Sequence, residues 1–336
     1  MMEIGPIRIR LCWLNRFRRW IRRLKRSGVS PPPTHRSFTV PVLVIRYFPV
    51  KNGRIDVNVT GSVDAPLDAI RRHTVETTKQ VIQALETGST YHGYKDPTAQ
   101  PSLRYQIVDT IEFLEPLPTY HKRGHQAPMT DYNAVMKRVD VRHWVEERGV
   151  KEAWLWGYHG GVIDLWESNM AGPYGDISNS NCDLTDLPVL SQTYTVYHYN
   201  YERGPSEAVE DHIHQIESVL KFVNHSLFWD KFVGQPGAWR CGWSHYPPNG
   251  EDNYDWDNPK YVWTDIEDWT PEGTGQKKRI NCTRWNVDSL TWFIYWMQNL
   301  PGANNGLTYR GRPLTNWWAF IGDFDSVMAA GLGLVE

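Results

Sequence analysis

The sequence predicts an α/β protein: a mostly parallel sheet with flanking helices, followed by a Trp-rich, irregular C-terminal elaboration. Stretches with strand character alternate with helical stretches of roughly 15 to 20 residues, as crossovers between parallel strands require. The apolar run at 38–50 is continuous, which is typical of a strand buried on both faces. After Asn224 the periodicity fades, and Trp, Gly, Pro, Asn and Asp become frequent.

The individual elements follow from their residue types. Strands are predicted where β-branched and aromatic residues cluster, at 38–50, 103–114, 151–157 and 193–201. Helices are predicted where apolar residues recur at helical spacing, at 64–86, 132–148, 206–223 and 290–300. The aromatic stretch 316–324 is expected to form a last strand or a seam closing the domain.

Three segments follow: a basic arm with a Pro-rich linker (1–36), the α/β core (37–226), and the Trp-rich elaboration packed on the same domain (227–336). Residues 1–30 carry nine Arg or Lys against one acid. This arm fits three interpretations: an amphipathic helix that touches a membrane surface, a disordered basic arm, or a mis-assigned chain start upstream of the true domain. It has no continuous apolar h-region, so no clear signal peptide is visible.

The charge and composition of the body exclude some classes. The remaining 306 residues hold 27 basic and 37 acidic side chains, a net −10, which argues against a nucleic-acid partner. No apolar run is long enough for a transmembrane segment. The 17 tryptophans, eleven of them between Trp229 and Trp318, are typical of secreted proteins that handle carbohydrate.

Four cysteines occur, without a CxxC pair, which argues against the common structural zinc sites. Cys241 and Cys282 flank the irregular Trp-rich segment. The sequence allows either a disulfide between these two cysteines or two free thiols.

The helix predicted at 206–223 carries the strongest chemical signal. Its apolar residues form one narrow stripe: Val209, Ile213, Ile216, Leu220 and Val223. A second stripe, about 80° wide, holds three acids and one imidazole: Glu207, Glu210, His214 and Glu217. His212 and His214 point about 200° apart on a helix, so they cannot bind one ion together.

Two strand ends should meet beside this helix, because the carboxyl ends of parallel strands share one edge of the sheet. The expected convergent groups are His159, Glu167, Glu202, Arg203, Glu207 and His214. Imidazoles and carboxylates around an open position suit a metal site, and a carboxylate pair suits metal-free acid/base catalysis. The alternative is an ordinary solvated helix face, with His214 paired to Glu210.

A second candidate metal site is the acidic loop 250–259. Asn253, Asp255 and Asp257 alternate as calcium ligands do, although the loop lacks the glycine and glutamate of an EF-hand. A plain acidic turn is the alternative.

The sequence contains no G-x-S-x-G, H-E-x-x-H, G-x-x-x-x-G-K-[ST] or G-x-G-x-x-G motif. We therefore expect no nucleotide cofactor, and the common serine hydrolases and zincins lose support.

Three segments resemble a group of large secreted bacterial proteins to which no activity is assigned: WESNMAGP (166–173), NYERGPSEAVEDHIHQIES (200–218) and HYPPNGEDNYDWDNP (245–259). The resemblance is spread over roughly half the chain. It implies an extracellular location and one coherent domain, and it carries over no catalytic residue. The basic N-terminus without a visible signal departs from that expectation.

The resulting hypothesis is a secreted hydrolase acting on a glycan or peptide polymer with a divalent metal, zinc or calcium. His159 and His214 would hold the metal, and Glu167 would join them or position water. Glu207 or Glu217 would act as base, and Arg203 would bind an oxyanion or a substrate carboxylate. The alternative is a non-catalytic carbohydrate-binding, adhesion or structural surface protein, with tryptophan platforms and calcium at Asp255 and Asp257.

Overall fold

The computed structural model describes residues 37–336 and is built around a five-stranded sheet of order β4-β1-β7-β9-β8. The strands are β1 (Phe38–Tyr47), β4 (Leu103–Phe113), β7 (Glu152–Gly157), β8 (Ser168–Ala171) and β9 (Tyr194–Asn200). Neighbouring strands are parallel except β8, which pairs antiparallel with β9. The α/β class with a mostly parallel sheet is confirmed. The predictions on the basic arm and its linker lie outside the described residues.

Burial explains the composition of the strands. The segment Val42–Ile45 of β1 is fully buried, because β1 lies between β4 and β7 and both of its faces are covered. The edge strand β4 instead has several exposed or half-buried positions. The antiparallel strand β8 escaped prediction, since four residues are too few to show a period.

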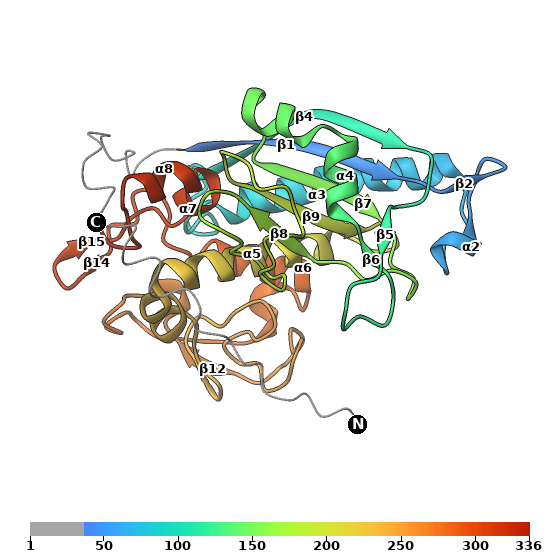
Figure 1. Ribbon diagram of the computed structural model, residues 1–336. Coiled ribbons are helices and arrows are strands. Elements are labelled where there is room, and N and C mark those ends of the chain that lie inside the picture. Colours follow the sequence, from blue (N-terminus) through green and yellow to red (C-terminus); the bar gives the residue numbers. More distant parts are fainter. Residues whose placement is uncertain (1–36) are drawn as a thin grey trace.

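Helices cover both faces of the sheet (Figure 1). On one face α3 (Leu67–Gly88), α5 (Pro205–His225) and α6 (Ser289–Met297) contact one another. On the other face lie α4 (Tyr132–Arg138) and the π-helical turn η1 (His143–Glu147). The predicted helix 132–148 is therefore interrupted, because Asp140 takes a left-handed conformation with φ 53°. None of the helices among residues 37–336 is long and apolar enough to cross a membrane.

Short elements complete the chain. Before α5 they are β2 (Val50–Lys51), β3 (Arg54–Ile55), α2 (Val57–Thr60), β5 (Thr119–Tyr120) and β6 (Met129–Thr130). After α5 they are η2 (Ser226–Val233), β10 (Gly234–Gln235), β11 (Ala238–Trp239), β12 (Val262–Thr264), η3 (Ile266–Asp268), β13 (Lys278–Ile280), η4 (Cys282–Trp285), β14 (Thr308–Tyr309), β15 (Arg312–Pro313), α7 (Ala319–Gly322) and α8 (Phe324–Ala329). Of the two alternatives predicted for 316–324, the strand is wrong, because Asn316 Oδ1 accepts from the Trp318 N–H and starts the turn that leads into α7. Trp317, Trp318 and Phe320 are buried in the core, as a closing aromatic segment requires.

The Trp-rich segment is irregular, and several of its indole N–H groups donate hydrogen bonds to backbone carbonyls of the loop. Trp292 and Trp256 both donate to the carbonyl of Ser244, at 3.0 and 2.9 Å, and Trp296 donates to Gly242 O at 2.9 Å. These bonds satisfy loop carbonyls that no strand or helix pairs. Among the described tryptophans Trp263 alone is exposed, at 67%. The tryptophans are therefore mainly a core beneath a long loop. Cys241 and Cys282 are free thiols.

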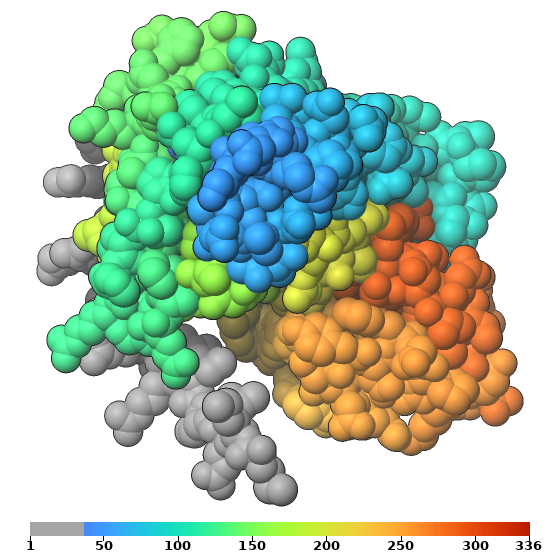
Figure 2. All heavy atoms as spheres, turned by 90° about the vertical axis from the view of Figure 1, so that its right-hand side faces the viewer, coloured from blue at the N-terminus to red at the C-terminus, as the bar shows by residue number. Residues whose placement is uncertain are grey.

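The crevice beyond the carboxyl ends of β1 and β7 is filled by the chain itself. A Cβ on Gly160 would lie 2.0 Å from Thr60 O, and one on Gly61 would lie 2.8 Å from Gly160 O. Only glycine permits such close contact between the loop after β1 and the loop after β7. In Figure 2, which faces this edge of the sheet, the blue segment after β1 covers the middle of the molecule. The reversal of strand order beside β1, where ligands usually bind, is thus occupied by the protein's own backbone.

Candidate metal centre

The main cleft, about 680 Å³, lies one strand further on, beside the carboxyl ends of β7 and β9. The first two turns of α5 form one wall, and Tyr254 and Trp256 of the C-terminal segment line the other side. Helix α5 starts here because Gly204 ends the strand connection and Pro205 opens the first turn. The acidic stripe of the helix is therefore presented at the edge where the strands end.

Three side chains converge at one point of this region. Glu210 and His214 lie one turn apart on α5, and His245 reaches them from the loop before Tyr246. Each offers one ligand atom, and these atoms all lie within 4.8 Å of one another. Glu210 Oε1 is 2.9 Å from His245 Nε2 and 3.7 Å from His214 Nε2. At most 16% of any of the three side chains is exposed.

The orientation of His245 fits a ligand better than a hydrogen-bonded pair. Its Nε2 is buried and close to Glu210, but the contact lacks hydrogen-bond geometry. The ring is held by Trp243, at 4.9 Å between centroids, and by Tyr254, at 4.2 Å. A buried nitrogen that is fixed beside a carboxylate without bonding to it suits coordination of a shared ion.

A second carboxylate orients His214 from behind. His214 Nδ1 lies 3.2 Å from Glu217 Oε2, and the other oxygen of Glu217 accepts the Ser244 N–H at 2.9 Å. His214 Nε2 is thereby directed towards Glu210 and, at 4.0 Å, towards Glu167. Metal-ligating histidines typically bond a carboxylate through their other nitrogen in this way. The residues present therefore fit a divalent metal held by Glu210, His214 and His245.

The electrostatics of the cluster reflect its pairing. Burial would raise the pKa of Glu210, but the adjacent His214 and His245 outweigh it and lower that pKa to about 2. Burial would lower the pKa of His214, but Glu210 and Glu217 raise it well above the usual value. Burial and the charge of Glu167 raise the pKa of Asp211 well above its ordinary range. The site concentrates negative charge that a cation would balance.

The structure places four of the eight predicted site residues along this cleft, and their roles differ. Glu167 and Arg203 line the cleft, and Arg203 is exposed at its rim. Glu207 also lines it, but its carboxylate accepts the Gly204 N–H and so caps α5. Glu217 lies behind His214 and is not among the cleft-lining residues.

The remaining predicted ligands lie apart from the triad. His159 lines the cleft with its Nδ1 bonded to Ile163 O, and it is not part of the converging group. Asp255 Oδ2 accepts from Glu251 N at 2.8 Å and from Asn258 Nδ2 at 2.7 Å, which closes its own turn. Asp257 is exposed beside it. Among residues 37–336 these aspartates belong to no group of three close ligand atoms.

Sequence reasoning placed Glu210 on the acidic stripe but treated it only as a partner of His214, and it passed over His245. The i, i+4 spacing of Glu210 and His214 was the signal available for the first. Nothing local marks His245, because it stands in an irregular loop whose return to α5 depends on the tertiary fold.

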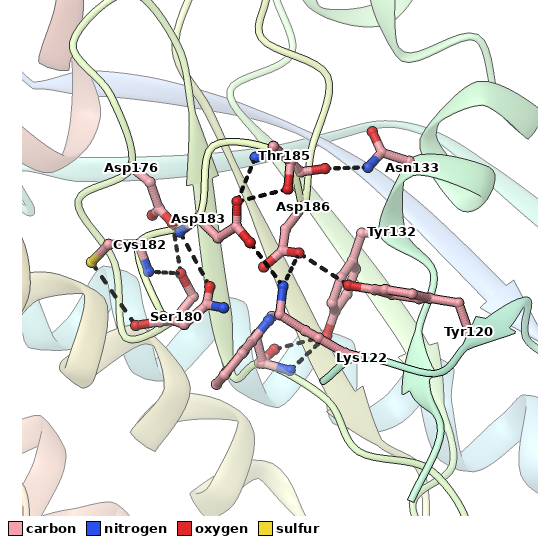
Figure 3. A network of polar contacts seen from close by, with 12 residues as sticks. Tyr120, Lys122, Tyr132, Asn133, Asp176, Ser180, Cys182, Asp183, Thr185 and Asp186 are labelled. Carbon is pink, nitrogen blue, oxygen red and sulfur yellow. Dashed lines mark hydrogen bonds and ion pairs between the residues drawn. The ribbon is translucent and has the colours of Figure 1, made fainter. Parts of the chain in front are cut away.

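The loop 176–186 supports Glu167 through Asn179. Figure 3 shows the ion pairs of Lys122 that hold this loop against the body. Asn179 Nδ2 donates to the Glu167 carboxylate, and Asn179 N donates to Ser168 Oγ at 3.1 Å. Lys122 lies between Asp183 and Asp186, and its side chain is only 13% exposed. This ion-pair network fixes the loop that positions Glu167 at the cleft.

No protein-family model matches the chain, and no curated protein matches it. The class of the molecule therefore rests on fold and site: an α/β protein with a candidate metal centre of two histidines and one glutamate beside the carboxyl edge of its sheet.

Proposed function

We propose that the protein is a metal-dependent hydrolase that acts on a glycan or peptide polymer outside the cell. The observation that carries the proposal is the convergence of Glu210, His214 and His245 beside a large open cleft. Two histidines and one glutamate are the ligand set of a familiar class of hydrolytic zinc site, in which the fourth position is left for water or substrate.

The donor set favours zinc over calcium. Calcium takes six to eight oxygen ligands, whereas two imidazole nitrogens and one carboxylate suit zinc. In tetrahedral geometry, zinc–ligand bonds of about 2.0 to 2.2 Å place neighbouring ligand atoms roughly 3.3 to 3.6 Å apart. The separations of 2.9 and 3.7 Å around Glu210 Oε1 are close to that range.

The chain's own residues then divide the work. A bound metal of this kind lowers the pKa of water and polarises the bond to be cleaved. Glu167, on the cleft side of His214, accepts the proton of the attacking water and returns it to the leaving group. Asn179 holds the Glu167 carboxylate, and Glu217 holds the His214 ring. Arg203, at the rim, binds a negative charge on the substrate.

The shape of the cleft supports a polymer substrate, because it is open and has aromatic side chains, Tyr254 and Trp256, along one wall. The extracellular setting is supported by the composition and by the resemblance noted in the sequence. The alternative of a non-catalytic binder with a tryptophan platform has less support, since Trp263 is the single exposed tryptophan among residues 37–336.

The test is the metal content of the full chain, measured by mass spectrometry, together with hydrolysis of polysaccharide and polypeptide panels. We expect one zinc ion per chain, lost in His214→Ala and His245→Ala together with hydrolysis. Glu207→Gln is the matched control, since Glu207 is a nearby acid on the same helix that caps its own backbone. Stoichiometric zinc in both histidine variants, or metal-free wild type with full hydrolysis, would contradict the proposal.

A further inference from the structure

A second cavity, about 220 Å³ in volume, lies at the opposite, amino edge of the sheet. It is bounded by the starts of β7 and β9, by the middle of α5 and by residues 320–326. None of the residues that line it belongs to the metal centre or its cleft. Its chemistry is therefore separate from the proposed hydrolysis.

Three side chains in this cavity each offer one oxygen that makes no hydrogen bond within the described residues. Gln215 donates through Nε2 to Ile177 O at 2.8 Å, and its buried Oε1 has no partner among the described residues. Glu152 accepts from Trp154 Nε1 at 2.8 Å through Oε2 only. The hydroxyl of Tyr197 makes no hydrogen bond within residues 37–336. A buried amide oxygen without a partner is costly, and Gln215 Oε1 shares this cavity with unpaired oxygens of Glu152 and Tyr197. Together the three oxygens point to a ligand that donates hydrogen bonds.

The charges around the cavity are mostly negative. Glu152, Asp323 and Asp325 line it with one cation, Lys151. The Lys151 ammonium is already bound to Gly322 O and, at 3.1 Å, to Asp323 Oδ1. Asp325 accepts two bonds from Thr193. Glu152 is thus the carboxyl group without a counter-ion, and it is only 4% exposed.

The apolar part of the wall is aromatic. Tyr194 and Tyr197 come from β9, and Phe320 and Phe324 come from the C-terminal helices. Aromatic rings bordering a carboxylate are a favourable environment for organic cations. The volume is below the roughly 300 to 1,000 Å³ of pockets for drug-sized ligands, so the ligand has few heavy atoms.

We propose that this cavity binds a small organic ammonium ion. Its N–H groups donate to Glu152, Gln215 and Tyr197, and its alkyl part lies against the aromatic wall. The proposal follows from unpaired acceptors, a buried carboxyl group and aromatic rings that enclose one small space.

Binding should be coupled to proton release. Burial raises the pKa of Glu152 to about 8, although the Trp154 hydrogen bond and the charge of Lys151 act in the other direction. Glu152 is therefore mostly protonated at pH 7 before the ligand arrives. An ammonium ion favours the carboxylate, so the carboxyl proton leaves to the buffer as the ion pair forms.

The experiment is isothermal titration calorimetry of the full chain with n-butylammonium at pH 7, in two buffers of different ionisation enthalpy. We expect saturable binding of butylammonium with release of a proton, and no binding of the neutral analogue 1-butanol. Glu152→Gln should weaken binding at least about tenfold and abolish proton release. Tyr197→Phe removes one acceptor and should weaken binding about fivefold.

The control is Glu76→Gln, an exposed acid on α3 that should leave binding unchanged. Thermal unfolding of each variant shows whether it is folded, and Tyr197→Phe keeps the test open if Glu152→Gln is not. The absence of saturable butylammonium binding below about 10 mM would overturn the proposal. Equal affinity of wild type and both cavity variants would overturn it as well.

Discussion

Two glutamates at opposite ends of the sheet, one partly buried and one fully buried, have pKa values shifted in opposite directions. Glu210, in the candidate metal centre, has a pKa lowered to about 2, and Glu152, in the amino-edge cavity, has a pKa raised to about 8. Burial pushes both values upward, so it cannot account for the difference. The partners do: Glu210 faces two histidines, whereas Glu152 has one indole N–H and no counter-ion.

The comparison shows that burial alone does not assign a carboxylate its chemistry. A carboxylate held ionised beside imidazoles is a ready metal ligand. A carboxyl group held neutral can instead ionise when a cation binds beside it. The experiments below test this contrast, in order of decreasing expected effect.

The largest effect concerns stability against pH. An unfolded glutamate ionises near its model value of 4.5, but folded Glu152 keeps its proton up to about pH 8. The free energy of unfolding should therefore fall as pH rises from about 4.5 to about 8, by up to roughly 5 kcal/mol, and then level off. Glu152→Gln should not show this fall with pH, so its free energy of unfolding should rise relative to that of wild type at high pH. Urea unfolding of both proteins at pH 5 and pH 9 measures it, and parallel pH curves would refute the assignment.

The next effect concerns the paired glutamate. Glu210→Gln keeps the shape but removes the charged ligand, so the dissociation constant for zinc should rise at least about 100-fold, a loss near 3 kcal/mol. Competition with a chromogenic chelator measures it, with Glu207→Gln as the control on the same helix. Unchanged affinity in Glu210→Gln would mean that the triad is not the metal site.

A third experiment separates the two faces of α5. His212 stacks on Tyr197, with 3.7 Å between centroids, and its Nε2 lies 2.6 Å from Tyr199 OH. His212→Phe should lower the free energy of unfolding by about 1 to 3 kcal/mol, because it leaves a buried hydroxyl unpaired, and should not affect metal content. His214→Phe should abolish zinc binding, because it removes a ligand of the candidate metal centre. A loss of metal in His212→Phe would show that the faces are coupled.

The smallest effect concerns the support of Glu167. Asn179→Ala removes the amide that bonds the Glu167 carboxylate, so kcat for hydrolysis should fall about five- to tenfold, roughly 1 kcal/mol. Zinc content and melting temperature should stay as in wild type, because Asn179 is exposed. A larger fall in melting temperature than in kcat would make Asn179 structural.

Much of the fold could be predicted from sequence, because its main elements have strong local patterns. The apolar run of β1 appears where expected, and α5 begins at Pro205, one residue before the start of the helix predicted at 206–223. The sequence did not predict the interruption of the helix at Asp140 or the helical turn at 319–322, because local backbone geometry and tertiary contacts determine both features.

The candidate site was predictable only in part. Helical spacing placed Glu210, His214 and Glu217 on one stripe, and the parallel sheet placed that stripe near Glu167. His245 and Glu152 carry no local signal: the first depends on how a long loop returns to α5, and the second is a single acid in an apolar strand.

The contact between Gly61 and Gly160 has a consequence for protein engineering. Residues 57–61 pack against the loop after β7 and occupy the crevice where sheets of this topology usually bind ligands. Replacing that segment with a short turn would open a second docking place one strand away from the triad, with every side chain of the triad untouched. The same scaffold could then host a grafted cofactor beside the candidate metal centre, and two chemistries could be combined within one molecule.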